Sequence, residues 1–208
     1  MTGSIATLSI LSPVLFNIYV NDLLSVPTYC KWACYVDDSE LNLSFPSSDM
    51  STAIHNLNAD LEQVSRWCCE NSLLINPDKT KVLMIGTPQL LNKLPTASVR
   101  MLGKEITPST VVKDLGIYID ESLTYNEHIA KTVSICLHKV VQINSIKHLL
   151  NKKTILLLLN SFVFSKLYYC STVWSNTSKH NINKLQLVQI LSKYLGKKLS
   201  TYFSLINL

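Results

Sequence analysis

The chain of 208 residues has few charged side chains and few glycines, and it lacks proline after residue 108. Charged residues make up 16% and hydrophobic residues 47%, which excludes a disordered charged tail because enough apolar material is present for a core. No proline follows Pro108, and four of the five glycines precede residue 117. Because proline and glycine interrupt regular structure, their scarcity favours helices in the remaining residues.

Acidic residues are absent after Glu127. Residues 128–208 contain 11 lysines and no acid, whereas residues 1–127 contain 8 basic and 14 acidic residues. The net charge of +5 therefore combines a balance of −6 with a later balance of +11. The change in charge nearly coincides with the loss of proline, which predicts two structural units with different partners.

Long uninterrupted apolar runs are absent as well. The first 16 residues have no basic region and contain Pro13, a pattern that argues against a signal peptide. Residues 154–174 are the candidate for a membrane span, but Asn160 and Lys166 lie inside this stretch. A buried helix is therefore favoured over a membrane-spanning one.

The six cysteines include no CxxC pair. Cys30 and Cys34 have the spacing of two zinc ligands, but no second pair or nearby histidine completes a site. Reduced cysteines are the expectation, and they predict an intracellular protein of the cytoplasm or nucleus. We also expect no contact with a membrane.

The spacing of apolar residues predicts helices and hairpins first, and helices alone afterwards. Steps of three and four indicate helices, and strict alternation indicates strands. The predicted elements are a helix from Ser12 toward Pro27, a hairpin over 31–45, a helix over 51–70, a hairpin of 73–75 and 82–85, a strand over 112–120, and helices over 128–150, 152–169 and 179–195.

The segment Tyr35-Val36-Asp37-Asp38 is the sharpest chemical feature. Adjacent carboxylates repel each other, and a sequence keeps them together where a cation neutralises them or water solvates them. A pair at a hairpin turn suits Mg²⁺, which binds one or two carboxylates together with substrate phosphate oxygens. The alternative is an ordinary solvated turn, since aspartate favours turns.

Five segments in this order resemble the reverse transcriptases of non-LTR retrotransposons, in the jockey-like LINE group. They are ILSPVLFNIYVNDL (10–23), CYVDDSELNLSF (34–45), LLINPDKTKVLMIGT (73–87), VVKDLGIYID (111–120) and KLQLVQ (184–189). The resemblance implies an α+β fold with a partial right-hand polymerase palm over residues 1–120. An all-helical, basic, thumb-like region over residues 121–208 would follow it.

The same resemblance implies roles for individual residues. Asp37 and Asp38 match the aspartate pair that binds two Mg²⁺ ions in this family, and Tyr35 and Val36 match the residues before it, where alanine is commoner than Val36. Lys79 matches a lysine proposed to protonate the leaving pyrophosphate. The implied reaction is attack of a DNA primer 3′-hydroxyl on a deoxynucleotide, directed by an RNA template.

The sequence also departs from the family pattern at some positions. Residues 6–9 read Ala-Thr-Leu-Ser where the family has Pro-Gln-Gly-Ser, and none of the first ten residues is acidic. The strand that carries the family's third catalytic aspartate is not in the sequence. We therefore expect a chain truncated at both ends that does not polymerise DNA alone.

The acid-free segment predicts contact with nucleic acid, because clustered lysines bind a phosphate backbone through counterion release. The candidate residues are Lys139, Lys147, Lys152 and Lys153. A solvated helical bundle is the alternative for this segment. For the whole chain, the alternatives are a non-catalytic nucleic-acid-binding remnant of a retroelement and an apolar helical interaction or membrane-associated protein.

Overall fold

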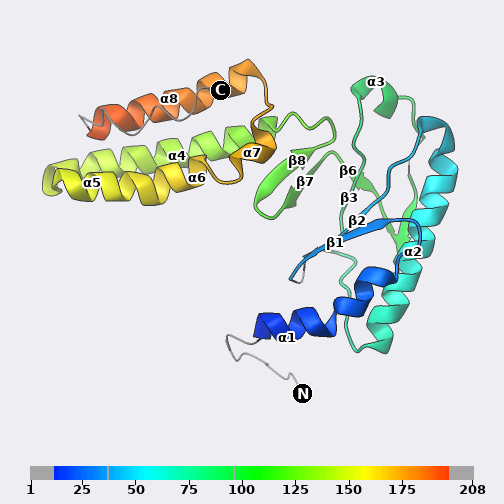
Figure 1. The fold of residues 1–208 in the computed structure, drawn as a ribbon. Coiled ribbons are helices and arrows are strands. Elements are labelled where there is room, and N and C mark those ends of the chain that lie inside the picture. Colours follow the sequence, from blue (N-terminus) through cyan, green and yellow to red (C-terminus); the bar gives the residue numbers. More distant parts are fainter. Residues whose placement is uncertain (1–11, 37, 96, 197–208) are drawn as a thin grey trace. The chain divides into compact units, whose positions relative to one another are not determined.

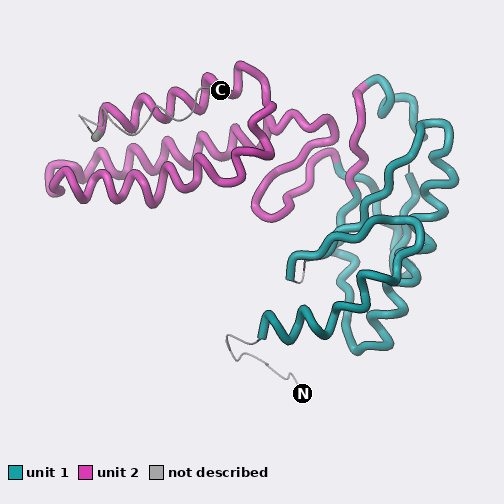
Figure 2. Tube along the Cα trace, in the orientation of Figure 1, with its two compact units in different colours: residues 1–82, 89–109 teal, residues 83–88, 110–208 magenta. Residues whose placement is uncertain are grey.

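The computed structural model describes residues 12–36, 38–95 and 97–196. The chain divides into two compact units, shown in Figure 2. The first unit consists of residues 1–82 and 89–109, and the second of residues 83–88 and 110–208. The short elements β3 (Val82–Leu83), α3 (Pro88–Leu91) and β6 (Pro108–Ser109) lie where the chain passes between them. The sequence places its domain boundary at residue 120, eleven positions after the last residue of the first unit.

The first unit is built around one long helix, α2 (Met50–Glu70), seen in cyan in Figure 1. Its other elements are α1 (Ser12–Tyr19), the 3₁₀ helices η1 (Asn21–Ser25) and η2 (Ser47–Asp49), the hairpin of β1 (Lys31–Tyr35) and β2 (Asp38–Asn42), and the hairpin of β4 (Val99–Met101) and β5 (Lys104–Ile106). The predicted first hairpin and the helix over 51–70 are confirmed.

An apolar cluster forms along the C-terminal half of α2, as the spacing of three and four predicted. We call it the α2 cluster; it consists of buried Leu23, Val64 and Cys68, with Val26, Trp32, Trp67, Leu73 and Ile75 packed against them. Trp32 lies on β1, whereas Leu73 and Ile75 lie in the segment after α2. The α2 cluster therefore attaches both the β1–β2 hairpin and the segment after residue 72 to the same helix.

Two polar side chains of α2 bind backbone groups of the hairpins. The carboxylate of Asp60 accepts hydrogen bonds from the N–H groups of residues 28–30, at 2.7–2.9 Å. The side chain of Asn58 accepts from the N–H of Arg100 at 2.8 Å and donates to the carbonyl of Ser98 at 3.2 Å. Backbone groups next to two hairpins are thus satisfied by one helix, which fixes where each hairpin begins.

The second unit is mostly helical. It contains the hairpin of β7 (Val111–Asp114) and β8 (Ile117–Asp120), then α4 (Asn126–Ile146), η3 (Lys147–Leu149), α5 (Lys152–Leu159), the π-helical segment η4 (Asn160–Phe164), α6 (Ser165–Leu167), α7 (Ser171–Trp174) and α8 (Lys179–Gly196). The helices predicted over 128–150, 152–169 and 179–195 are confirmed, although the second of them contains the π-helical segment and ends before Cys170, which has φ 48°.

The core of the second unit lies between α4, the α5–α6 segment and α8. Ile129, Cys136, Leu159, Val163 and Val188 are fully buried there. Residues 154–174 thus supply core residues of a folded unit. In the described part of the chain, no helix combines the length and the apolarity that a membrane crossing needs.

Two sequence predictions are wrong. Residues 73–75 form no strand: Leu73 donates its N–H to Cys68 at 2.8 Å, and its side chain packs in the α2 cluster, so the segment continues around the helix end. Residues 112–120 do not form one strand but the β7–β8 hairpin, because Leu115 and Gly116 both adopt positive φ. A two-residue turn with two positive φ values matches the twist of a hairpin, so Gly116 is a turn residue.

We predict that Leu159→Ala lowers the free energy of unfolding by about 2–5 kcal/mol, because the substitution leaves a cavity in the core of the second unit. Leu157 lies on the same helix and is 64% exposed, whereas Leu159 is 0% exposed. Leu157→Ala is therefore the matched control and should change stability by less than about 0.5 kcal/mol. Urea unfolding of the three proteins measures both values, and equal losses would contradict the position of α5 in the core.

Candidate functional site

The β1–β2 hairpin presents the predicted acidic turn at its tip. Tyr35 pairs with Asp38 as the last pair of the ladder, so the chain turns after Tyr35, where Val36 lies. Asp38 is exposed at the first position of β2. Asp37 lies outside the described residues. The structure thus places Tyr35, Val36 and Asp38 together at one solvent-exposed end of the hairpin.

Val36 has a left-handed backbone conformation, with φ 58°. The two turn types that suit a two-residue hairpin require positive φ at this first central position. A β-branched residue adopts this region at a cost of order 1–3 kcal/mol, and such strain is often found at functional sites. The thiol of Cys34 donates to the Val36 carbonyl at 3.2 Å and accepts from the Ser39 hydroxyl at 3.7 Å, which further ties the turn to both strands.

Asp60 stays ionised although it is fully buried. Burial raises the pKa of this carboxyl group, but the hydrogen bonds from the N–H groups of Thr28, Cys30 and Tyr29 more than offset this and lower the pKa below its ordinary value. Burial, followed by the neighbouring Asp60 carboxylate, raises the pKa of the Cys30 thiol to about 12, so the thiol stays protonated beside it. Sequence reasoning missed Asp60; the available signal was an acid on the apolar stripe of α2, three residues after Leu57 and four before Val64.

Lys79 lies in the turn predicted from Asn76-Pro77-Asp78-Lys79. Its N–H donates to the Asn76 carbonyl at 3.2 Å, and the Asn76 side chain accepts from the N–H of Asp78 at 2.9 Å. The Thr80 hydroxyl also donates to the Asn76 carbonyl, at 3.2 Å. Asn76 and Thr80 therefore both stabilise the turn that carries Lys79.

The charge of Lys79 is exposed to solvent. Its neighbour Asp78 forms an ion pair with Lys104 instead, and this hydrogen bond lowers the pKa of Asp78. Among the ion pairs of the described residues, none includes Lys79. The segment before the turn and the β1–β2 hairpin are both held by the α2 cluster, so the two predicted site elements share one support.

The donor set of the hairpin suits a hard cation. Within residues 12–36, 38–95 and 97–196, no group of three or more histidine, cysteine or acidic side chains is arranged to hold a metal ion. Asp38 with its neighbour in sequence Asp37 supplies carboxylate oxygens only, the ligands that Mg²⁺ takes together with substrate phosphates. The residues thus fit a Mg²⁺ ion that substrate helps to bind, and do not fit a closed structural metal site.

The four lysines predicted to bind nucleic acid do not form one group. Lys147, Lys152 and Lys153 are exposed around the connection between α4 and α5. Lys139 lies earlier on α4, is half-buried, and donates to the Gln142 side chain at 3.1 Å. Lys152 and Lys153 occupy the first turn of α5, where the helix dipole disfavours positive charge and favours an anion.

A second basic group of the same unit was missed by sequence reasoning. Tyr118 on β8 has the Lys131 ammonium 3.7 Å and the Lys113 ammonium 5.8 Å from its ring centroid. Lys113 and Tyr118 are cross-strand partners in the β7–β8 hairpin. A cation over an aromatic face is a stable arrangement on a protein surface. A correct prediction of the β7–β8 hairpin would have placed Lys113 opposite Tyr118 and so would have indicated this group.

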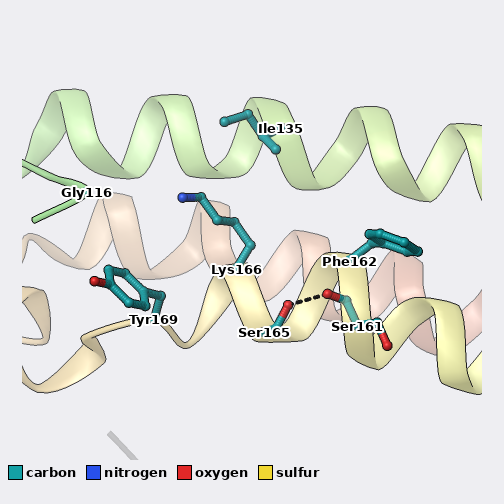
Figure 3. Close-up of a pocket in the computed structure, with 7 residues that line it drawn as sticks. All are labelled: Gly116, Ile135, Ser161, Phe162, Ser165, Lys166 and Tyr169. Carbon is teal, nitrogen blue, oxygen red and sulfur yellow. Dashed lines mark hydrogen bonds between the residues drawn. The ribbon is translucent and has the colours of Figure 1, made fainter. Parts of the chain in front are cut away.

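Shallow hollows occur in both units. In the second unit, a hollow of about 390 Å³ lies beside the π-helical segment, with Gly116, Ser161, Phe162 and Lys166 among its lining residues (Figure 3). The charge of Lys166, after burial, contributes to lowering the pKa of His128. In the first unit, a hollow of about 570 Å³ is lined by α1 and η1. Neither hollow includes Asp38 or Lys79.

Comparison with known proteins finds a similarity that includes both the acidic turn and the turn that carries Lys79. Residues 9–106 match the family model of reverse transcriptase (RNA-dependent DNA polymerase). This segment, just under half of the chain, includes the β1–β2 hairpin, α2 and the turn with Lys79.

A curated relative extends the similarity into the second unit. The probable RNA-directed DNA polymerase from transposon BS of Drosophila melanogaster is 27% identical over 194 residues, which cover 87% of this chain. The chain spans 21% of the length of that relative. No solved structure matches the chain. The resemblance to the reverse transcriptase of a transposon is thus confirmed, whereas the non-LTR subgroup and the palm-and-thumb arrangement stay predictions.

We predict that the stability of the chain falls as the pH drops through the lowered pKa of Asp60. A carboxyl group with a lower pKa in the folded state stabilises the fold above its unfolded pKa of about 3.9 and loses this contribution on protonation. Asp60→Asn, which cannot titrate, should therefore flatten the dependence of Tm on pH between about pH 5 and 2. Glu62→Gln, at an exposed position of the same helix, should leave the dependence of Tm on pH unchanged. If Asp60→Asn showed the same dependence as the wild type, the assignment of this effect to Asp60 would be refuted.

Proposed function

We propose that this chain takes part in RNA-directed DNA polymerisation by a transposable element, and that the β1–β2 hairpin is its metal-binding part. The observation that carries the proposal is the exposed acidic turn inside the segment that matches the reverse transcriptase family. The name of the 27% identical relative supports the same chemistry and the same kind of element. The proposed partners are an RNA template, a DNA primer and deoxynucleotides.

In this proposal, Asp37 and Asp38 hold Mg²⁺ at the hairpin tip. Bound Mg²⁺ would supply activation of the primer 3′-hydroxyl and stabilisation of charge on the leaving pyrophosphate. Val36, with φ 58°, lies in the turn directly before these two aspartates in the sequence. Lys79, exposed and outside the ion pairs of its neighbours, is the proposed donor of a proton to the pyrophosphate.

The second unit is proposed to hold the template–primer. This proposal is supported by the positive charge of residues 128–208, which contain no acidic residue, and by the exposed lysines around the α4–α5 connection. Lys152 and Lys153 sit against the helix dipole of α5, and a bound phosphate would remove that cost. Lys113, Tyr118 and Lys131 offer a second basic and aromatic group on the same unit.

A second candidate function is nucleic-acid binding without catalysis, as a remnant of a retroelement. It is favoured by the finding that, among the described residues, no three or more acidic, histidine or cysteine side chains form a group that could hold a metal ion. Under this alternative the lysines keep their role, whereas Asp38 and Lys79 have none. Mg²⁺-dependent primer extension that requires Asp37 would favour the first candidate, whereas binding to a duplex is expected under both.

We predict that the purified chain with Mg²⁺ does not extend a DNA primer on an RNA template, because two metal ions would share two adjacent carboxylates, whereas the family that the sequence resembles supplies a third aspartate. Incorporation of labelled deoxynucleotide measures this. Mg²⁺-dependent extension that disappears in Asp37→Asn would contradict the prediction and would establish the hairpin as a complete metal site.

We predict that the chain binds an RNA–DNA duplex with an affinity that falls steeply with salt. Replacing Lys147, Lys152 and Lys153 by alanine should reduce the slope of log K against log salt by about 3, since each phosphate contact contributes about one. Fluorescence anisotropy at several salt concentrations measures the slope. Lys93→Ala in the first unit is the control, and a triple variant with the wild-type slope would rule out this surface.

A further inference from the structure

The attachment of the β1–β2 hairpin to α2 depends on few contacts. Among the described residues, this hairpin belongs to a sheet of only two strands, so no third strand fixes its position by backbone pairing. Its contacts with the helix include Trp32 in the α2 cluster, Asp60, which binds the backbone just before β1, and Gln63, which accepts from the Thr28 hydroxyl at 3.4 Å. The indole N–H of Trp32 is buried with no hydrogen-bond partner among the described residues, so Trp32 contributes packing and no directional bond.

The bonds of Asp60 are directional. One carboxylate oxygen accepts from the N–H of Thr28 at 2.8 Å, and the other accepts from Tyr29 at 2.9 Å and from Cys30 at 2.7 Å. Charge-assisted bonds of this kind are about twice as strong as neutral ones. Three successive N–H groups on one buried carboxylate allow one position of the chain along the helix, and β1 starts at the next residue, Lys31.

The position of β1 determines where the acidic turn lies. Because side chains alternate along a strand, a slip of one residue would turn every side chain of the hairpin to the opposite face. The tip lies only four residues beyond Lys31, about 13 Å away at the rise of a strand. A tilt at the base of the hairpin would therefore displace Asp38.

We propose that Asp60 is a positioning residue of the β1–β2 hairpin, which sets the place and orientation of Asp38 by holding the backbone of residues 28–30. The inference rests on the proposed metal-binding function of the hairpin. Asp60 does not touch the metal or the substrate in this account; it acts through the strand that it fixes. Residues that orient metal ligands from outside the coordination shell typically change metal affinity 10–100-fold when they are replaced.

Two substitutions remove the hydrogen bonds of Asp60 to different extents. Asp60→Asn keeps the shape and one acceptor oxygen, but places an amide N–H₂ against an N–H group. Asp60→Ala removes all three bonds. Asn58→Ala is the matched control, because it removes the backbone bonds that the same helix makes to the β4–β5 hairpin.

Hydrogen exchange of the full chain tests the positioning without any metal. Amide exchange of residues 28–42 should become faster in Asp60→Asn and faster still in Asp60→Ala, whereas α4 and α8 in the second unit keep wild-type protection. Asn58→Ala should instead affect residues 98–106. Wild-type protection of residues 28–42 in both Asp60 variants would overturn the inference.

Mn²⁺ binding, followed by electron paramagnetic resonance of the free ion, tests the consequence. Asp60→Asn should weaken binding about tenfold, Asn58→Ala should leave it within about twofold even where it lowers Tm by a similar amount, and Asp38→Asn should abolish it. Unchanged affinity in both Asp60 variants would overturn the inference and leave Asp60 a residue of stability alone. Wild-type binding that Asp38→Asn does not alter would instead refute the proposed function, while the exchange data would still show whether Asp60 holds the hairpin.

Discussion

A buried carboxylate in the middle of a helix is costly unless hydrogen bonds surround it, and Asp60 meets this condition with three backbone N–H groups. The arrangement solves two problems together. The N–H groups of residues 28–30 lie before the first strand and have no ladder partner there, and the carboxylate needs donors in order to remain charged inside the protein. Asn58 repeats the principle two residues earlier on α2 for the second hairpin of the same unit. The helix thus serves as a support whose polar side chains determine where each hairpin begins.

The sequence predicted those elements whose pattern is local. The stripe of Leu57, Leu61 and Val64 indicated α2, and the alternation around Asp37 and Asp38 indicated the β1–β2 hairpin. The predicted secondary structure was wrong where contacts with residues distant in the sequence, or an unusual backbone conformation, determine it. Leu73 and Ile75 look like a strand, but the apolar surface of α2 takes up their side chains. The turn at Leu115 and Gly116 requires a leucine with positive φ, which no propensity indicates, so one strand was predicted in place of the β7–β8 hairpin.

The candidate site shows the same limit. Asp38 and Lys79 were predicted from their residue types and from a resemblance to known reverse transcriptases. Both lie within residues 9–106, the segment that matches the model of that family. Asp60 was missed because its partners are backbone groups about 30 residues away, and backbone groups leave no mark in a sequence. Of the four predicted lysines, three gather at the α4–α5 connection, whereas Lys139 bonds to Gln142 instead. Spacing along a helix could not distinguish these cases, since the connection brings residues of two helices together.

The central claim is that the tip of the β1–β2 hairpin binds a divalent cation. The direct measurement is the paramagnetic broadening of backbone amide signals by Mn²⁺ at less than one equivalent, observed by NMR on the whole chain. The account predicts that the signals of Tyr35, Val36 and Ser39 broaden first, and that Asp38→Asn removes the effect. Broadening that spreads evenly over the acidic residues of the chain, or that persists unchanged in Asp38→Asn, would contradict it.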